Sequence, residues 1–428
     1  MANQMIAVRQ GTITEEVRRV ARMEGVSAER LRDRIARGTA IVVCNNSGDC
    51  KPLGIGEGLR TKINANIGTS TDICDLSFEL EKAKVAIRYG TDTIMDLSTE
   101  GDLDYIRSAI IKEVKVPFGT VPLYQSYIET VRRNKNPTSM NLDQLFNVIE
   151  KHMRDGVAFM TVHCGITLDA VKHLIGHPRL NGIVSRGGAF LAAWMLYNGR
   201  ENPLYSDYDY LLELAKKYDV TLSLGDALRP GSLADASDYA QFQELLTISH
   251  LVKRAWDAGV QVIVEGPGHL PLDQVEANVK MEKILCKGAP FYLLGPVVTD
   301  IATGFDHIAG AIGGALAVMV GADYLCYVTP SEHLGLPDID DVRQGVIASK
   351  IAAHTGDIVK LGRRAIKHDI EVSKSRSLLD WEAQIRLSLD PDKAREIHRR
   401  KNSKSGTCTM CGDWCTYKII KDTLKKLR

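Results

Sequence analysis

Three cysteines stand close together near the end of the chain, in the segment Cys408-Thr-Met-Cys411-Gly-Asp-Trp-Cys415. Thiolates at this spacing predict a bound metal or cluster. Structural zinc usually takes four ligands, and no second Cys-x-x-Cys pair exists in the chain, although a distant histidine could complete such a site. Three cysteines suit a [4Fe–4S] cluster with one open iron, which can bind S-adenosylmethionine (SAM) and cleave it to a 5′-deoxyadenosyl radical. The spacing favours iron–sulfur over zinc.

Two histidines follow apolar runs elsewhere in the chain, in Glu265-Gly-Pro-Gly-His269 and in Glu332-His333. Imidazole is a good ligand for zinc and similar divalent ions. A pair of histidines would leave the remaining coordination positions to water, substrate or SAM. The alternative interpretation is a pair of hydrogen-bonded histidines without a metal.

Two further segments combine arginine with glycine: Ser185-Arg186-Gly187-Gly188 and Asp226-Ala-Leu-Arg229-Pro-Gly. A glycine turn beside a guanidinium can hold a phosphate through backbone N–H groups and a forked ion pair. Pairing between arginine and carboxylate side chains is the alternative. We therefore expect a phosphorylated ligand near these residues.

The elements that would position these residues are short apolar runs separated by segments of helical length. We count eight runs, and they are TDTIMDLS, VPFGTVPLY, VAFMTVHCG, GIVSRGG, VTLSLGDALRPG, VQVIVEGPGH, APFYLLGPVVTD and ADYLCYVTPSEH. Strand–helix alternation predicts parallel strands, and eight repeats favour a closed (β/α)₈ TIM-type barrel over an open doubly wound sheet. Nearly every run ends in polar residues, which the barrel would gather at one face.

The bulk composition fits a globular enzyme. Of 428 residues, 44% are hydrophobic and 25% are charged, and the net charge of +1 gives no reason to expect nucleic acid or a membrane surface as a partner. No apolar run approaches the ~20 residues of a membrane span, and the first residues lack the apolar core of a signal peptide. We expect a cytoplasmic protein with an N-terminal α/β region over residues 1–75, a barrel over 76–365, and C-terminal helices with a cysteine-rich tail over 366–428.

Many of these segments together resemble the phosphomethylpyrimidine synthase family. The resemblance extends from about residue 10 to 420 and rests on INANIGTS, IMDLST, GTVPLYQ, TVHCGI, VSRGG, LRPGS, VEGPGHLPLDQVEANV, GAPFYLLGP, CYVTPSEHLGLP and CTMCGDWC. It implies a barrel enzyme, usually a homodimer, that rearranges 5-aminoimidazole ribotide with SAM and a [4Fe–4S] cluster. It also implies an electron donor such as flavodoxin or ferredoxin.

The resemblance assigns roles residue by residue. It implies that His269 and His333 bind zinc or a similar ion, that Cys408, Cys411 and Cys415 hold the cluster, and that Glu265 acts in catalysis. The residues that it places around the ribotide are Asn66, Met95, Tyr124, His163, Ser185, Arg186, Gly187, Asp226, Ala227, Leu228, Arg229, Glu265 and Tyr292.

One segment departs from the pattern of the thiamine enzymes. Thr303, Phe305, Ala309 and Gly310 stand where those enzymes have proline, tyrosine and a threonine–serine pair, and we treat these four positions as candidates for product specificity. We expect a radical SAM carbon–carbon lyase that makes 5-hydroxybenzimidazole, the lower ligand of a cobamide (vitamin B12). The alternative is phosphomethylpyrimidine synthase, which makes 4-amino-5-hydroxymethyl-2-methylpyrimidine phosphate for thiamine. Further alternatives are a zinc-dependent barrel lyase or hydrolase with a structural zinc tail, and an inactive paralogue.

Overall fold

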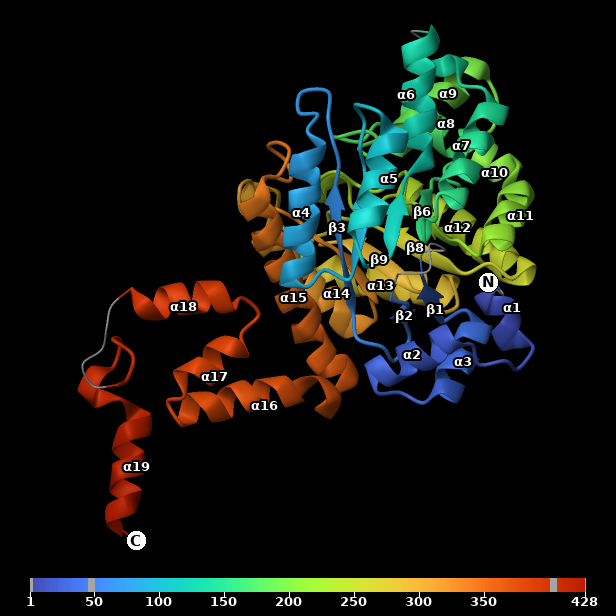
Figure 1. Cartoon of the computed structure of the whole chain (residues 1–428). Helices are drawn as coiled ribbons and strands as arrows, with labels where there is room; N and C mark the ends of the chain where they lie inside the picture. The colour runs from blue at the N-terminus through green and yellow to red at the C-terminus, as the bar shows by residue number, and fades with distance from the viewer. Residues whose placement is uncertain (1–2, 45–50, 135, 401–405, 428) are drawn as a thin grey trace. The chain divides into compact units, whose positions relative to one another are not determined.

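The computed structural model describes residues 3–44, 51–134, 136–400 and 406–427. The chain forms two compact units, residues 1–360 and residues 361–428. Figure 1 shows the elements of both units. No helix among the described residues is both long enough and apolar enough to cross a membrane.

The larger unit is built on a closed barrel of eight parallel strands in the order β10-β3-β4-β5-β6-β7-β8-β9. This confirms the predicted (β/α)₈ fold. The strands are β3 (Lys62–Ile67), β4 (Thr93–Asp96), β5 (Phe118–Thr120), β6 (Phe159–Val162), β7 (Thr221–Leu224), β8 (Val262–Gly266), β9 (Phe291–Leu294) and β10 (Tyr324–Cys326).

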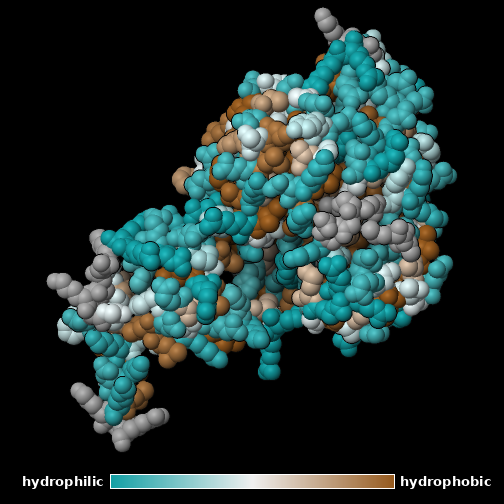
Figure 2. Space-filling view, viewed as in Figure 1, coloured by the Kyte–Doolittle hydropathy of each residue, from teal (hydrophilic) through white to brown (hydrophobic). Residues whose placement is uncertain are grey.

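Helices surround the barrel on its outside (Figure 1). They are α4 (Leu76–Tyr89), α5 (Leu103–Glu113), α6 (Pro122–Asn134), α7 (Leu142–Arg154), α8 (Leu168–Gly176), α9 (Arg186–Asn198), α10 (Pro203–Ser206), α11 (Tyr208–Tyr218), α12 (Tyr239–Ala258), α13 (Leu272–Leu285), α14 (Asp306–Val320) and α15 (Ile339–Leu361). The helices at the top and right of this view present mainly hydrophilic residues to the outside (Figure 2). Their inward faces pack on the apolar core around the strands.

Before the barrel, three short helices pack on a two-stranded antiparallel sheet. They are α1 (Gln4–Arg9), α2 (Glu15–Glu24) and α3 (Ala28–Arg37), and the strands are β1 (Ala40–Val43) and β2 (Leu53–Gly56). Side-chain hydroxyls of Thr14 and Ser27 cap α2 and α3. An N-terminal α/β region is therefore present, as expected, although the first barrel strand begins at Lys62, ahead of the predicted boundary at residue 75. The three-domain division itself stays a prediction.

The strand assignment differs from the sequence prediction at two places. GIVSRGG is not a strand: Ser185 caps the start of α9 by accepting a hydrogen bond from the N–H of Gly188, at 3.2 Å. The eighth strand is instead β3, whose sequence KINANI was not among the predicted runs. Its polar residues point into the barrel, where Asn64 donates to the hydroxyl of Tyr292 at 2.9 Å and accepts from Thr93 at 2.8 Å. Buried polar side chains of this kind hide a strand from a search for apolar runs.

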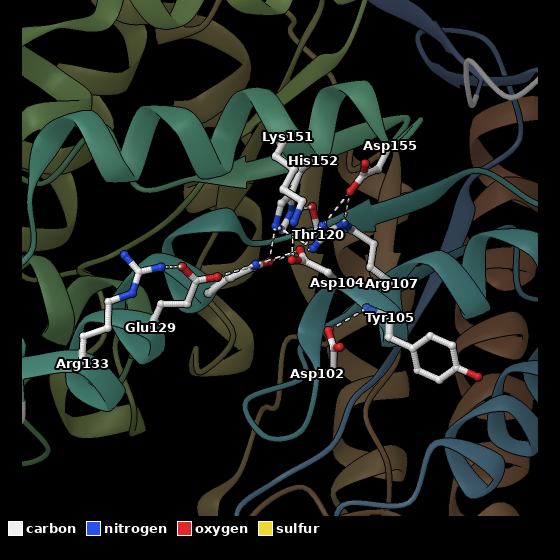
Figure 3. A network of polar contacts seen from close by, with 11 residues as sticks. Asp102, Asp104, Tyr105, Arg107, Thr120, Glu129, Arg133, Lys151, His152 and Asp155 are labelled. Carbon is white, nitrogen blue, oxygen red and sulfur yellow. Dashed lines mark hydrogen bonds and ion pairs between the residues drawn. The ribbon is translucent and has the colours of Figure 1, made fainter.

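A polar network outside the barrel joins α5, α6 and α7 to the end of β5 (Figure 3). The guanidinium of Arg107, which is only 2% exposed, donates to Asp155 and Asp104 at 2.6 Å and to Gln125 at 2.7 Å. His152 Nδ1 lies 2.9 Å from the Thr120 hydroxyl. Burial lowers the pKa of His152 well below its ordinary value, so the imidazole is neutral and its Nε2 can accept from Arg107, 2.9 Å away. The network holds α6 against the strand that precedes it.

We expect Arg107→Leu to lower the free energy of unfolding by about 3 kcal/mol. The value lies at the low end of the range for a broken buried ion pair, because Asp104 and Asp155 keep partial exposure to solvent. Urea unfolding followed by circular dichroism measures the change. The matched control is Arg133→Leu, because Arg133 makes an exposed ion pair with Glu129 at 3.2 Å that contributes less than about 1 kcal/mol. Equal unfolding midpoints for the two variants would show that the network adds no stability.

The smaller unit contains α16 (Arg363–Ser377), α17 (Trp381–Arg386), α18 (Pro391–Arg399) and α19 (Thr416–Leu427). The cysteine segment lies between α18 and α19 and includes one turn of 3₁₀ helix, Gly412–Trp414. The predicted C-terminal helices and cysteine-bearing tail are therefore present.

Candidate active site

A cavity of about 400 Å³ opens at the carboxyl ends of the barrel strands. Nine of the thirteen residues predicted to surround the ribotide line it, and they are Asn66, Met95, Tyr124, His163, Arg186, Asp226, Arg229, Glu265 and Tyr292. They come from strands and loops that lie far apart in the sequence, and the barrel brings them together. A second cavity of about 220 Å³ shares Asn66 and Arg186 with the first.

The other four predicted residues lie beside the cavity. Ser185 caps the start of α9, Gly187 lies in its first turn, and Ala227 and Leu228 are fully buried. A Cβ atom on Gly187 would lie 2.3 Å from the ring of His163, and one on Gly188 would lie 2.4 Å from the carbonyl oxygen of Ala227. Only glycines therefore allow the start of α9 to approach the cavity this closely.

The start of α9 is suited to an anion. The hydroxyl of Ser185 accepts a hydrogen bond from the N–H of Gly188. The N–H groups of Arg186 and Gly187 remain available at the positive end of the helix. The guanidinium of Arg186 lies 5.1 Å from the ring centroid of Tyr124, and among the described residues no carboxylate pairs with it. A phosphate placed here would meet both a helix N-terminus and a free cation.

The cavity also contains the acidic side chains of Glu265 and Asp226. Glu265 Oε1 accepts from the hydroxyls of Thr161 at 2.8 Å and Ser223 at 2.5 Å. Burial, with some repulsion from Asp226, raises the pKa of Glu265 to about 7. Burial also raises the pKa of Asp226 to about 6, although Arg229 donates to it at 2.9 Å. A carboxyl whose pKa lies near neutrality can both accept and donate a proton.

His163 adds an uncharged polar group to the cavity wall. Burial lowers its pKa to about 3, so the ring is neutral. Its Nδ1 has no hydrogen-bond partner among the described residues. A buried polar atom without a partner is costly, which indicates that a ligand supplies the missing hydrogen bond.

Three contacts of the site were not predicted. Cys326 lines the cavity, where its thiol accepts from Asn66 at 3.1 Å and burial raises its pKa to about 12. Thr161 and Ser223 orient Glu265, as described above. All three lie in barrel strands and point inward, and only the alternation of inward and outward residues could have identified them.

The loop that carries Asp226 and Arg229 is fixed from behind by Glu244. This glutamate of α12 is 3% exposed, and its two oxygens accept the N–H groups of Ala227 at 2.9 Å and Leu228 at 2.7 Å. One buried carboxyl group, whose pKa burial raises to about 8, therefore holds two consecutive backbone amides between Asp226 and Arg229. Nothing in the local sequence of α12 marks Glu244 for this role.

The two predicted histidine ligands face each other. Nε2 of His269 and Nε2 of His333 are 3.2 Å apart. Each Nδ1 lies 3.0 Å from a carboxylate, Asp300 for His269 and Asp306 for His333. The carboxylate beside each Nδ1 holds its ring so that the two Nε2 atoms turn toward one another. A divalent cation between the rings would bind both Nε2 atoms, and carboxylate–histidine pairs are common around such ions.

The four positions considered for product specificity do not line the cavity. Thr303 and Phe305 are exposed, and Phe305 is 63% exposed. Ala309 packs against Val297 and Val328, and Gly310 also lies against Val328. These positions flank Asp300 and Asp306, the partners of the two histidines. The specificity role of the four positions stays a prediction.

The cysteine segment supplies sulfur ligands of the right kind for a cluster. Cys408 and Cys411 are partly exposed and Cys415 is buried. Hydrogen bonds from the backbone of Cys411 and Met410 lower the pKa of the Cys408 thiol. Burial and the neighbouring sulfurs of Cys408 and Cys415 raise that of Cys411. Such backbone contacts to sulfur are typical of iron–sulfur sites.

Within the described ranges, no three His, Cys, Asp or Glu side chains converge as a complete metal site. The fit of a cluster therefore rests on the three thiols and their backbone contacts. The fit of a divalent ion rests on the two opposed imidazoles.

Comparison with known proteins identifies the family of the chain. Residues 3–422 match the family described as "Radical SAM ThiC family". A phosphomethylpyrimidine synthase of Geobacter metallireducens is 54% identical over 99% of this chain and 98% of its own length. A protein named phosphomethylpyrimidine synthase 2, of Syntrophotalea carbinolica, is 54% identical over 99% of both chains. A phosphomethylpyrimidine synthase of Caldanaerobacter subterraneus is 55% identical over 97% of this chain and 96% of its own.

Proposed function

Because the chain belongs to the radical SAM ThiC family, we propose that it is a phosphomethylpyrimidine synthase. It converts 5-aminoimidazole ribotide to 4-amino-5-hydroxymethyl-2-methylpyrimidine phosphate, as a radical SAM carbon–carbon lyase of thiamine synthesis. The name of the relatives supports this product, which was the alternative from sequence, better than 5-hydroxybenzimidazole. The structural observation that carries the proposal is the barrel-mouth cavity that combines an anion site with a proton-exchanging carboxyl.

In this proposal the chain's own residues bind and orient the ribotide. Arg186 and the start of α9 hold the phosphate. A ligand atom forms the hydrogen bond that Nδ1 of His163 lacks among the described residues. Glu265 accepts a hydrogen bond from the amino N–H of the aminoimidazole and moves a proton during the rearrangement.

Cys408, Cys411 and Cys415 would hold the [4Fe–4S] cluster, and His269 and His333 would hold zinc or a similar ion. When bound, the cluster and SAM supply the radical that abstracts hydrogen from carbon. The 220 Å³ cavity beside the ribotide site gives room for a second ligand. A one-electron donor such as flavodoxin or ferredoxin, a homodimeric state and a cytoplasmic location complete the proposal.

The test is an anaerobic reaction of the reconstituted protein with aminoimidazole ribotide, SAM and a reductant, with the products identified by mass spectrometry. We expect 5′-deoxyadenosine together with a phosphorylated hydroxymethylpyrimidine. A benzimidazole without phosphate would overturn the proposed product and direct attention to Thr303, Phe305, Ala309 and Gly310. The absence of 5′-deoxyadenosine would overturn the radical chemistry as a whole.

We expect Glu244→Gln to raise KM for the ribotide about tenfold while kcat changes less. The amide keeps the size of the side chain but can accept only one of the two N–H groups, so the loop with Asp226 and Arg229 loosens. Initial rates at varied ribotide concentration measure the effect. Glu282→Gln is the matched control, because Glu282 is also fully buried but lies beside Lys283 and Asp323 rather than at the cavity. A similar KM in both variants would contradict a positioning role for Glu244.

A further inference from the structure

The two units of the chain carry opposite charge. Residues 361–428 contain 17 lysines and arginines against nine acidic residues, a net charge of +8, whereas residues 1–360 have a net charge of −7. The overall balance of +1 conceals this difference. The unit that bears the three cysteines is therefore strongly basic, which favours approach of an acidic partner.

Part of this positive charge is concentrated on α19, which begins at Thr416, directly after Cys415. Lys418, Lys421 and Lys425 are spaced i, i+3 and i+7 and so share one face of the helix. Among the described residues, no carboxylate forms an ion pair with any of the three. The basic face starts within one helical turn of the third cysteine.

An apolar stripe runs beside the lysines on the same helix. Tyr417, Ile420 and Leu424 have the same spacing and are 43%, 57% and 56% exposed. None of the side chains described between Thr416 and Lys425 is buried. A helix of this length is marginally stable in water without a packing partner. Within the described part of residues 361–428, no side chain covers this surface.

The cysteine segment itself adds two exposed apolar side chains. Met410 is 91% exposed and Trp414 is 81% exposed, and each is next to a cysteine. Methionine and tryptophan are enriched at protein interfaces, where a polar rim surrounds an apolar centre. Met410, Trp414 and α19 thus supply both an apolar centre and a basic rim.

We propose that this surface, consisting of Met410, Trp414 and α19, docks a small acidic protein that carries one electron. The inference rests on the proposed function, because a cluster that cleaves SAM must first be reduced. In the docked complex the carrier is oxidised by one electron and the cluster is reduced by one, with no bond made or broken. The lysines attract and orient the carrier, and the apolar stripe excludes water from the contact beside the cysteines.

The test uses the full-length, cluster-loaded enzyme with the three substitutions Lys418→Glu, Lys421→Glu and Lys425→Glu. SAM cleavage is measured as 5′-deoxyadenosine formed, once with a reduced acidic flavodoxin at varied concentration and once with dithionite. We expect the flavodoxin concentration for half-maximal rate to rise at least about tenfold, and the dithionite rate to stay unchanged. The wild-type response to flavodoxin should also weaken steeply with salt, and the response of the variant should not.

The control carries the same change in net charge elsewhere on the basic unit, at the exposed residues Lys367→Glu, Lys374→Glu and Arg399→Glu. It should respond to flavodoxin as the wild type does. A second set with glutamine at the three positions of α19 preserves helix propensity and should give an intermediate effect.

Three outcomes would overturn the proposal. An equal loss with flavodoxin and dithionite would show that α19 acts in the enzyme's own chemistry. An equal loss in the control would assign the effect to overall charge. An unchanged flavodoxin response in the α19 variant would place the docking surface elsewhere. If the wild type forms no 5′-deoxyadenosine even with dithionite, the proposed function fails as well.

Discussion

Glu265→Gln should lower kcat by a factor of about 10² to 10⁴ while leaving the fold intact. The glutamine oxygen can still accept from the hydroxyls of Thr161 and Ser223, so the side chain keeps its position. It cannot exchange a proton, which is the property that burial confers on this carboxyl by raising its pKa to about 7. The loss should therefore appear in kcat more than in KM for the ribotide.

The pH dependence follows from the same pKa. The ionised form of Glu265 accepts an N–H from the substrate, so kcat/KM of the wild type should rise as the pH rises through about 7. For stability the sign is opposite. The folded-state pKa is raised above the ordinary value of 4.5, so the contribution of Glu265 to stability is full below about pH 4.5 and is lost as the pH rises through 7.

Glu265→Gln should accordingly be more stable than the wild type at pH 8, by about 2 kcal/mol. Urea unfolding at pH 5 and pH 8, together with rate measurements from pH 6 to 9, tests both halves of the prediction. Glu282→Gln is again the control, because burial raises the pKa of Glu282 to about 8 away from the cavity. Both variants should gain stability at pH 8, and only Glu265→Gln should lose turnover. A turnover within about threefold of the wild type would remove Glu265 from the proton-transfer role.

The barrel and much of its mouth could be predicted from sequence because both depend on local patterns. Apolar runs of strand length alternate with helical segments, and polar residues such as His163 and Glu265 stand at or just beyond the ends of the runs. In a closed parallel barrel these ends meet, so their chemistry could be grouped without coordinates. The strand β3 was missed because its inward residues Asn64 and Asn66 are polar and form hydrogen bonds with each other and with residues of neighbouring strands.

The remaining parts of the site depend on contacts that no local pattern encodes. Glu244 lies in the middle of a helix, and only the fold brings its carboxylate to the amides of Ala227 and Leu228. Asp306 follows Phe305 in the segment considered for specificity. Its hydrogen bond to His333 shows that this segment also positions one of the two histidines. The charge difference between the two units was also invisible in the overall balance, because it appears only when the boundary between them is known.

The second large effect concerns the cysteines. Cys411→Ala should abolish SAM cleavage, by at least about a thousandfold, because the cofactor carries the difficult chemistry and two thiolates cannot hold a cluster that requires three. Cys411 is partly exposed and lies between the other two cysteines in sequence, so its loss should disturb packing little.

Iron content and the broad absorbance near ~400 nm of anaerobically reconstituted protein measure the cluster directly, independently of turnover. The control is Cys74→Ala, an exposed cysteine of the barrel unit, which should keep both iron and activity. Ribotide binding offers a further readout, because the barrel cavity lies in the other unit and Cys411→Ala should bind the ribotide as the wild type does. Full iron content in Cys411→Ala would mean that another residue serves as the third ligand, and the cysteine segment would then require a different role.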